Sequence, residues 1–293
     1  RDADIAMYRA KALGKARHEI FDSTMYSQVT KLLELEMDLR RAVERQEFQV
    51  YYQPIVLLET YKIIGFEALV RWQHPQLGLV PPDNFIPLAE ETGLIIPIGY
   101  WVLGEACRQM RAWQIQFPSD PPLTISVNLS TKQFLQPELI EQINQIIQET
   151  GLESSNLKLE ITESVLMENI QSVTFMLLQL QKMNIQLHLD DFGIGYSSLS
   201  YLHRFPSNAL KIDRSFVTKI GVNGENLEIV QAIITLAQSL NIDVIAEGIE
   251  TAEQLAQLRA MKCKYAQGYL FSQPLDSKSI ETLIASGIQP IQG

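Results

Sequence analysis

The chain has 293 residues, of which 46% are hydrophobic, and its formal net charge is −10. This length and apolar share suffice for a large barrel domain with an appendage. The acidic balance argues against binding to a nucleic acid polymer, because that mode needs a basic face. No apolar run reaches the length of a membrane span, so we expect no membrane contact from this segment and a cytoplasmic location, although missing upstream segments could anchor a parent protein.

Two cysteines, Cys107 and Cys263, have no metal-ligand spacing and are expected to be reduced, buried thiols. Residues 23–48 are predicted to form one helix, because apolar residues from Leu32 to Ala42 recur at steps of 3 and 4. We expect this helix to pack against the following domain rather than form a signalling coiled coil, because its apolar positions are few.

From residue 49 onward, short β-rich runs alternate with helical segments, which is typical of βα units around a parallel sheet. The first two runs are joined only by LLETYK, which is too short for a crossover helix, so they should form an antiparallel hairpin. Residues 49–293 are therefore predicted to form an α/β domain, a TIM-like (β/α)8 barrel with an antiparallel first strand. The eight runs are 49–56, 63–72, 123–130, 157–163, 185–192, 209–213, 243–249 and 265–271.

Polar and apolar side chains alternate along the third, fourth and fifth runs. Because successive side chains of a strand point to opposite faces, Asn128, Glu160 and Asp190 are expected to face the barrel interior. The other runs add polar residues near their ends, where barrel enzymes build their active sites. These residues are Glu67, Arg71, Lys211, Glu247 and Gln267.

Asp190 and Asp191 end the fifth run and lead into a glycine-rich loop, in HLDDFGIGYSSL. Adjacent carboxylates repel each other unless a cation lies between them, so the pair predicts a metal site. Oxygen donors favour Mg²⁺ or Mn²⁺, and this set could hold two ions roughly 4 Å apart, as in phosphoester cleavage. The candidate ligands are Glu67, Asn128, Glu160, Asp190 and Asp191. His188 shares the interior face but is expected to be a core residue rather than a ligand.

Two further residues are candidates for catalysis. Glu247 could accept a proton from the attacking water, and Lys211 could orient that water or balance charge. Arg71 could clamp a phosphate through two hydrogen bonds, and its alternative role is a salt bridge to one of the carboxylates.

Nine blocks in order identify the chain as resembling the EAL family of cyclic di-GMP phosphodiesterases over about residues 32–274. These blocks are YYQPIV, EALVRW, FIPLAEETGLI, VNLS, LEITES, DDFGIGYSSL, LKIDRSFV, AEGIET and QGYLFSQPL. The resemblance implies Mg²⁺- or Mn²⁺-dependent hydrolysis of cyclic di-GMP to linear pGpG, with the same metal ligands and with Lys211 and Glu247 activating the water. It also implies that Gln53, Arg71 and Gln267 bind substrate, that Glu163 holds the loop after the aspartate pair, and that the protein is a homodimer.

The resemblance has one departure, since Ile194 stands where Thr or Ala is common and removes a hydroxyl that could bond within the loop. Residues 1–22 resemble the C-terminal end of a GGDEF domain, so a GGDEF domain and an unknown sensor domain are expected upstream. The alternative function is a catalytically weak or inactive EAL domain that acts as a cyclic di-GMP binding or sensor module, but none of the metal carboxylates is lost. DFG also occurs in protein kinases, whose other motifs do not accompany it here.

Overall fold

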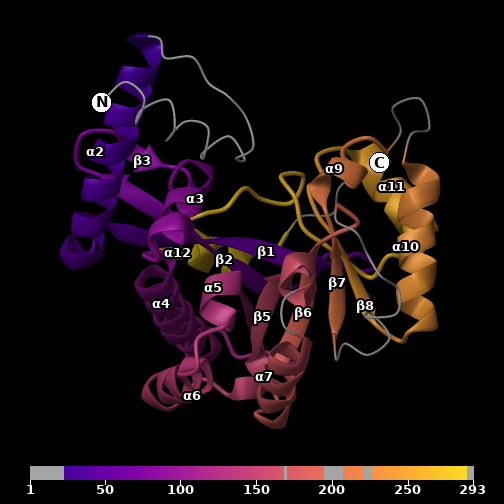
Figure 1. Ribbon diagram of the computed structural model, residues 1–293. Coiled ribbons are helices and arrows are strands. Elements are labelled where there is room, and N and C mark those ends of the chain that lie inside the picture. The colour runs from indigo at the N-terminus through magenta and orange to yellow at the C-terminus, as the bar shows by residue number, and fades with distance from the viewer. Residues whose placement is uncertain (1–22, 168–169, 195–206, 221–225, 289–293) are drawn as a thin grey trace. The chain divides into compact units, whose positions relative to one another are not determined.

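The computed structural model describes residues 23–167, 170–194, 207–220 and 226–288 (Figure 1). The chain divides into two compact units, of which the first takes residues up to 49 and 71–95, and the second takes 50–70 and the residues from 96 onward. Two long strands, β1 (Phe48–Leu57) and β2 (Ile63–His74), contribute residues to both units.

The first unit contains α2 (Ser23–Arg45), the end of β2, β3 (Gly78–Val80) and α3 (Pro82–Thr92). The helix expected over 23–48 is present as α2, and within this unit it packs against α3. Leu39 and Ala42 of its apolar stripe are fully buried. The short strand β3, which pairs antiparallel with β2, has no counterpart among the predicted runs.

The second unit is built on a closed sheet. Its further strands are β4 (Thr124–Asn128), β5 (Leu157–Thr162), β6 (Gln186–Phe192), β7 (Ala209–Ile212), β8 (Asp243–Ala246) and β9 (Tyr265–Ala266). Hydrogen bonds connect them in the order β1-β9-β8-β7-β6-β5-β4-β2, and β1 pairs with β2 to close the ring. The predicted (β/α)8 barrel is confirmed, and its first strand runs antiparallel to β9.

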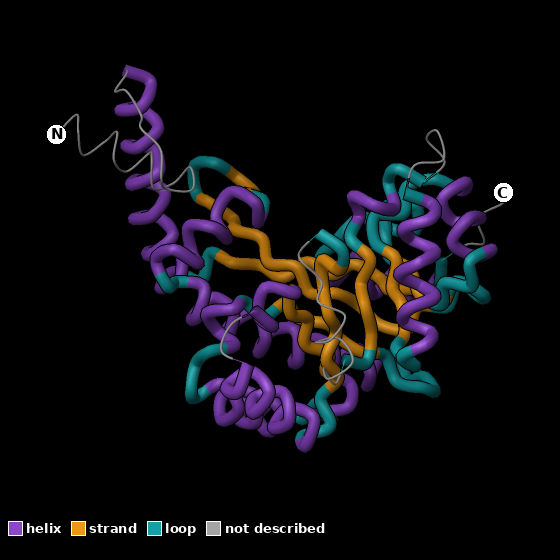
Figure 2. Tube along the Cα trace, turned by 45° about the vertical axis from the view of Figure 1, so that its right-hand side comes forward, coloured by secondary structure: helices purple, strands orange, loops and turns teal. Residues whose placement is uncertain are grey.

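Helices lie outside these strands, as the purple and orange segments of Figure 2 show. They are α4 (Ile95–Gln116), α5 (Thr131–Phe134), α6 (Leu139–Thr150), α7 (Ile170–Lys182), α9 (Arg214–Val217), α10 (Leu227–Ser239), α11 (Ala252–Ala260) and α12 (Ser277–Ser286). Two 3₁₀ turns, η1 (Ser154–Asn156) and η2 (Glu163–Met167), flank β5. Within the described ranges, none of the helices combines the length and apolar character needed to cross a membrane.

The last strand is much shorter than the run predicted over 265–271. After Ala266 the chain turns over the backbone of Ile249, whose oxygen accepts a hydrogen bond from the amide of Leu270 at 2.9 Å. A Cβ at Gly268 would lie 2.2 Å from that oxygen, so a glycine is needed for this close approach. The turn leaves Gln267 at the end of β9.

The barrel interior has an apolar part and a polar part. Ile55, Ala209 and Ile245 come from β1, β7 and β8 and form a buried cluster, here called the apolar floor. Neighbouring strands β4, β5 and β6 instead carry Asn128, Glu160 and His188 in direct register. The expected alternation therefore places Glu160 and His188 in the buried interior, whereas Asn128 is exposed at the end of β4.

Candidate active site

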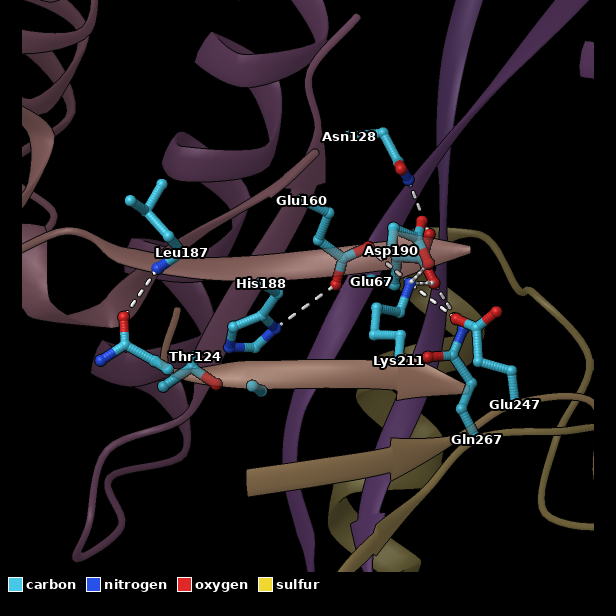
Figure 3. Close-up of polar contacts among 12 residues, drawn as sticks. Glu67, Thr124, Asn128, Glu160, Leu187, His188, Asp190, Lys211, Glu247 and Gln267 are labelled. Atoms are coloured by element: carbon cyan, nitrogen blue, oxygen red, sulfur yellow. Dashed lines mark hydrogen bonds and ion pairs between the residues drawn. The ribbon is translucent and has the colours of Figure 1, made fainter. Parts of the chain in front are cut away.

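Lys211 lies at the centre of a buried group of carboxylates near the carboxyl ends of the barrel strands (Figure 3). Its Nζ donates hydrogen bonds to Oε2 of Glu160 at 2.6 Å and to Oε2 of Glu67 at 3.2 Å. It also lies 2.6 Å from Oε1 of Glu247 and 3.4 Å from Oδ1 of Asp190. Side chains from β2, β5, β6, β7 and the segment after β8 thus meet at one ammonium, and we call them the Lys211 cluster.

Side-chain amides hold Glu67 from both sides. Asn128 Nδ2 donates to Oε1 of Glu67 at 2.7 Å, and Gln267 Nε2 donates to Oε2 at 2.6 Å. The same Gln267 nitrogen lies 2.8 Å from Oε1 of Gln53, whose own Nε2 donates to the backbone oxygen of Ser272 at 3.0 Å. Residues from the first and last strands of the barrel therefore orient one carboxylate of the cluster.

The adjacent aspartates differ in environment. Asp190 is buried in the Lys211 cluster, whereas Asp191 is exposed at the end of β6. The backbone of Asp191 has a φ of 53°, in the left-handed region that aspartate tolerates better than most residues. Its amide donates to Oδ1 of Asp190 at 2.9 Å. The strand continues one residue beyond the pair, to Phe192, and the loop that follows lies largely outside the described residues.

The carboxylates of the cluster outnumber its one ammonium, and this shifts their titration. Burial raises the pKa of Glu160 well above its usual value, and the charges of Glu67 and Asp190 add to the rise while Lys211 opposes it. Burial likewise raises the pKa of Asp190 and brings that of Glu247 to about 8, again against the pull of Lys211. Partial burial and the charges of Asp190 and Asp213 raise the pKa of Asp191.

The pKa values of two groups in the cluster shift in the direction that favours the charged form, although both groups are buried. The ammonium of Lys211 and the amide hydrogen bonds outweigh the burial of Glu67, so the pKa of this carboxyl lies below its usual value. Burial would lower the pKa of Lys211, but the surrounding carboxylates hold it well above the usual range. Lys211 and Glu67 therefore form the ionised core of the cluster.

The donor set fits a divalent cation. Glu160 Oε1 is buried and receives no hydrogen bond from the residues that the structure describes. The cluster has more carboxyl groups than ammonium groups, and its oxygens are the donors that Mg²⁺ and Mn²⁺ prefer. Across the described ranges, however, no three acidic, histidine or cysteine side chains form a ready-made metal centre, because the carboxylates are gathered around Lys211.

Arg71 and Glu163, which were also predicted to belong to the site, are not members of the Lys211 cluster. Arg71 lies on β2 beyond Glu67, in the residues assigned to the first unit. Glu163 begins the turn after β5, and its Oε2 is buried without a hydrogen bond from the described part of the chain. The loop that Glu163 is predicted to hold continues through residues 195–206, which lie outside the described residues. Ile194, just before it, is exposed.

Sequence reasoning did not single out Asp213. This residue is 8% exposed, follows β7 and accepts a hydrogen bond from the amide of Ser215 at 2.8 Å, so it caps α9. Its charge also raises the pKa of Asp191. Its spacing could have indicated it, because Asp213 lies two residues after Lys211 and residues two apart on a strand share a face.

Comparison with known sequences gives a family and close relatives. The EAL domain family matches residues 36–274. The bifunctional diguanylate cyclase/cyclic di-GMP phosphodiesterase MucR of Pseudomonas aeruginosa is 43% identical over 284 residues, which are 97% of this chain and 41% of MucR. The cyclic di-GMP phosphodiesterase PdeR of Escherichia coli is 39% identical over 281 residues, 96% of this chain and 42% of PdeR. The chain thus spans less than half the length of these curated relatives.

Solved structures show the same similarity. The structure of the PaMucR phosphodiesterase in complex with c-di-GMP matches with a TM-score of 0.81 and 43% identity, covering 84% of this chain and 99% of that one. The EAL enzyme Bd1971 with cAMP and cyclic-di-GMP bound matches with a TM-score of 0.84 and 35% identity, covering 95% of this chain and 73% of that one.

Proposed function

Because the chain belongs to the EAL domain family, we propose that it hydrolyses one phosphodiester bond of cyclic di-GMP and releases linear pGpG. The observation that carries the proposal is the Lys211 cluster, which assembles acidic side chains from separate strands at the end of a barrel where such enzymes act. Support comes from MucR and PdeR, which are named as cyclic di-GMP phosphodiesterases, and from the c-di-GMP complex of PaMucR.

Divalent cations complete the proposed site. Glu67, Asn128, Glu160, Asp190 and Asp191 would hold two Mg²⁺ or Mn²⁺ ions. When bound, such ions polarise the phosphate, neutralise its developing charge and lower the pKa of a water molecule.

Glu247 is the proposed proton acceptor. Its pKa of about 8 lies near neutral pH, where a general base combines availability with driving force. Lys211, 2.6 Å from its Oε1, holds the carboxylate in place. As the water oxygen bonds to phosphorus and the bond to the leaving ribose oxygen breaks, the water's proton passes to Glu247 and the leaving oxygen takes a proton from solvent.

Substrate contacts are proposed for Gln53, Gln267 and Arg71. The Gln53 and Gln267 amides are joined by a hydrogen bond of 2.8 Å, and Gln267 also donates to Glu67, which places polar groups beside the cluster. Arg71 offers a guanidinium that can bind a phosphate with two hydrogen bonds. Glu163 is proposed to steady the loop after Asp191.

The wider context of the chain is also proposed. We expect a homodimer in the cytoplasm, with a GGDEF domain and a sensor domain upstream of the EAL domain. The GGDEF-like residues 1–22 lie outside the described part of the chain.

Incubation of the purified protein with cyclic di-GMP and Mn²⁺, followed by chromatography, tests the proposal. We expect pGpG to form, and Glu67→Gln to abolish its formation because the isosteric amide carries no charge. Glu141→Gln, which alters an exposed glutamate of α6, is the matched control and should keep full activity. Tight binding of cyclic di-GMP without product would show instead that the chain is a binding module.

A further inference from the structure

His188 lies beside Glu160 in the barrel interior. On β6 it is the direct register partner of Glu160 on β5, and its partner on the other side is Ala209 of β7. The side chain of Ala209 has no polar atom, so of these two register partners only Glu160 can form a hydrogen bond with the imidazole. The side chain of His188 is 2% exposed and that of Glu160 is fully buried.

One atom of each side chain lacks a hydrogen bond. His188 Nδ1 and Glu160 Oε1 are both buried, and neither bonds to any residue within the described ranges. They lie 3.7 Å apart and point toward each other in Figure 3. A buried polar atom without a partner costs about 1–3 kcal/mol, and a small rotation to a normal separation of about 2.9 Å would satisfy both. The other carboxylate oxygen, Oε2, stays with Lys211 at 2.6 Å.

A neutral imidazole has one N–H, so the partner of each ring nitrogen depends on the tautomer. As a metal ligand Glu160 is ionised, so its Oε1 can accept but not donate a hydrogen bond, which calls for the proton on Nδ1.

We propose that His188 is a positioning residue for Glu160. Its Nδ1–H donates to Oε1, and this hydrogen bond fixes the orientation of the Glu160 carboxylate within the Lys211 cluster, where the cations would bind. The inference rests on the proposed function only in taking Glu160 as a metal ligand. Hydrogen-bond partners of metal ligands fix the ligand orientation, and their loss costs roughly 10–100-fold in metal affinity.

Mn²⁺ titrations followed by electron paramagnetic resonance test the proposal without turnover. His188→Leu removes the donor, whereas His188→Asn keeps an N–H near the place of Nδ1–H. We expect Mn²⁺ affinity to fall roughly 10–100-fold in His188→Leu and to stay within about threefold of wild type in His188→Asn. Gln186→Leu, a half-buried position on the same face of β6, is the matched control and should bind Mn²⁺ as wild type does.

Nitrogen-15 chemical shifts of the imidazole give a second readout on the unaltered protein. The Nδ1–H tautomer supports the proposal, and the Nε2–H tautomer overturns it. Wild-type affinity in a folded His188→Leu variant, or equal losses in the leucine and asparagine variants, would also overturn it. If His188→Leu does not fold, the tautomer and the asparagine variant decide. If the wild-type protein binds no Mn²⁺, the proposed metal site fails, while the tautomer still decides whether His188 donates to Glu160.

Discussion

Nζ of Lys211 lies 2.6 Å from Oε1 of Glu247, and this buried ion pair joins β7 to the segment after β8. The same ammonium neutralises part of the charge on Glu160, Glu67 and Asp190. In the absence of metal, Lys211 is therefore the cation that offsets the charge of these carboxylates.

Replacing Lys211 with methionine should destabilise the metal-free protein. Removing one partner of a buried ion pair leaves uncompensated charge, so we expect a loss of about 3–5 kcal/mol in urea unfolding at pH 8. Lys264→Met is the control, because Lys264 pairs with Asp243 at 2.9 Å while both side chains are half exposed. That pair should contribute at most about 1 kcal/mol. Equal effects of the two substitutions would contradict a central role for Lys211.

The stability of the metal-free protein should fall as the pH rises from about 5 to about 8, and it should level off above that. The pKa of Glu247 is raised from 4.5 to about 8, so between these values the folded state binds more protons than the unfolded state. Stability is then lost as pH rises toward the folded pKa. Thermal unfolding in EDTA should show this fall, with a smaller slope in Glu247→Gln, and a slope unchanged by the substitution would contradict the raised pKa.

Divalent cations should stabilise the protein more at high pH than at low pH, which is opposite to the pH trend of the metal-free protein. Ionised carboxylates bind metal and protonated ones do not, so binding competes with protonation. We expect Mn²⁺ to raise the melting temperature more at pH 8.5 than at pH 6.5. An equal rise at both pH values would show that Mn²⁺ binds away from the Lys211 cluster.

Gln267→Leu should impair catalysis by releasing Glu67. The substitution removes the 2.6 Å hydrogen bond to Oε2 of Glu67 and the 2.8 Å contact with Gln53. A hydrogen bond to a charged group contributes about 1.5–3 kcal/mol, so kcat/KM for cyclic di-GMP should fall roughly 10–150-fold. Gln145→Leu is a matched control, because Gln145 donates to Glu149 at 2.7 Å on the exposed side of α6. A comparable loss in the control would point to a general effect on folding.

Gly268→Ala should disturb the same region through the backbone. An added Cβ would lie 2.2–2.8 Å from backbone atoms of Ile249, so the turn that carries Gln267 must shift. We expect both the melting temperature and activity to fall. Gly104→Ala, in the middle of α4 where a Cβ meets nothing within 4 Å, should instead stabilise by about 0.5–1 kcal/mol. If Gly104→Ala destabilised the protein as Gly268→Ala does, the expected difference between the two positions would be contradicted.

The alternation of polar and apolar residues predicted much of this fold. It placed Asn128, Glu160 and His188 on one face because the side-chain period of a strand is a local property. The short link after β1 likewise predicted the antiparallel first strand. The short strand β3 and the early end of β9 escaped prediction, because they depend on contacts with β2 and with Ile249 that sequence spacing does not reveal.

The residues of the Lys211 cluster were singled out from the sequence, but their arrangement was not. Carboxylates at strand ends indicated a shared cation, and the structure shows that Lys211 occupies the middle of the group. The pairing of Gln267 with Gln53 joins opposite ends of the barrel sequence and has no local signal. His188 was predicted as a core residue, and it is buried, but its orphaned Nδ1 becomes apparent only beside Glu160.

The apolar floor of Ile55, Ala209 and Ile245 lies within the same barrel as the Lys211 cluster and is almost completely buried. Charged species cross such a layer only at high cost, so the proposed ions would reach the carboxylates from the carboxyl ends of the strands. A dinucleotide seated there would cover the same entrance. Metal exchange and product departure would then be coupled, and a slowly released product would keep the ions in place between rounds of hydrolysis.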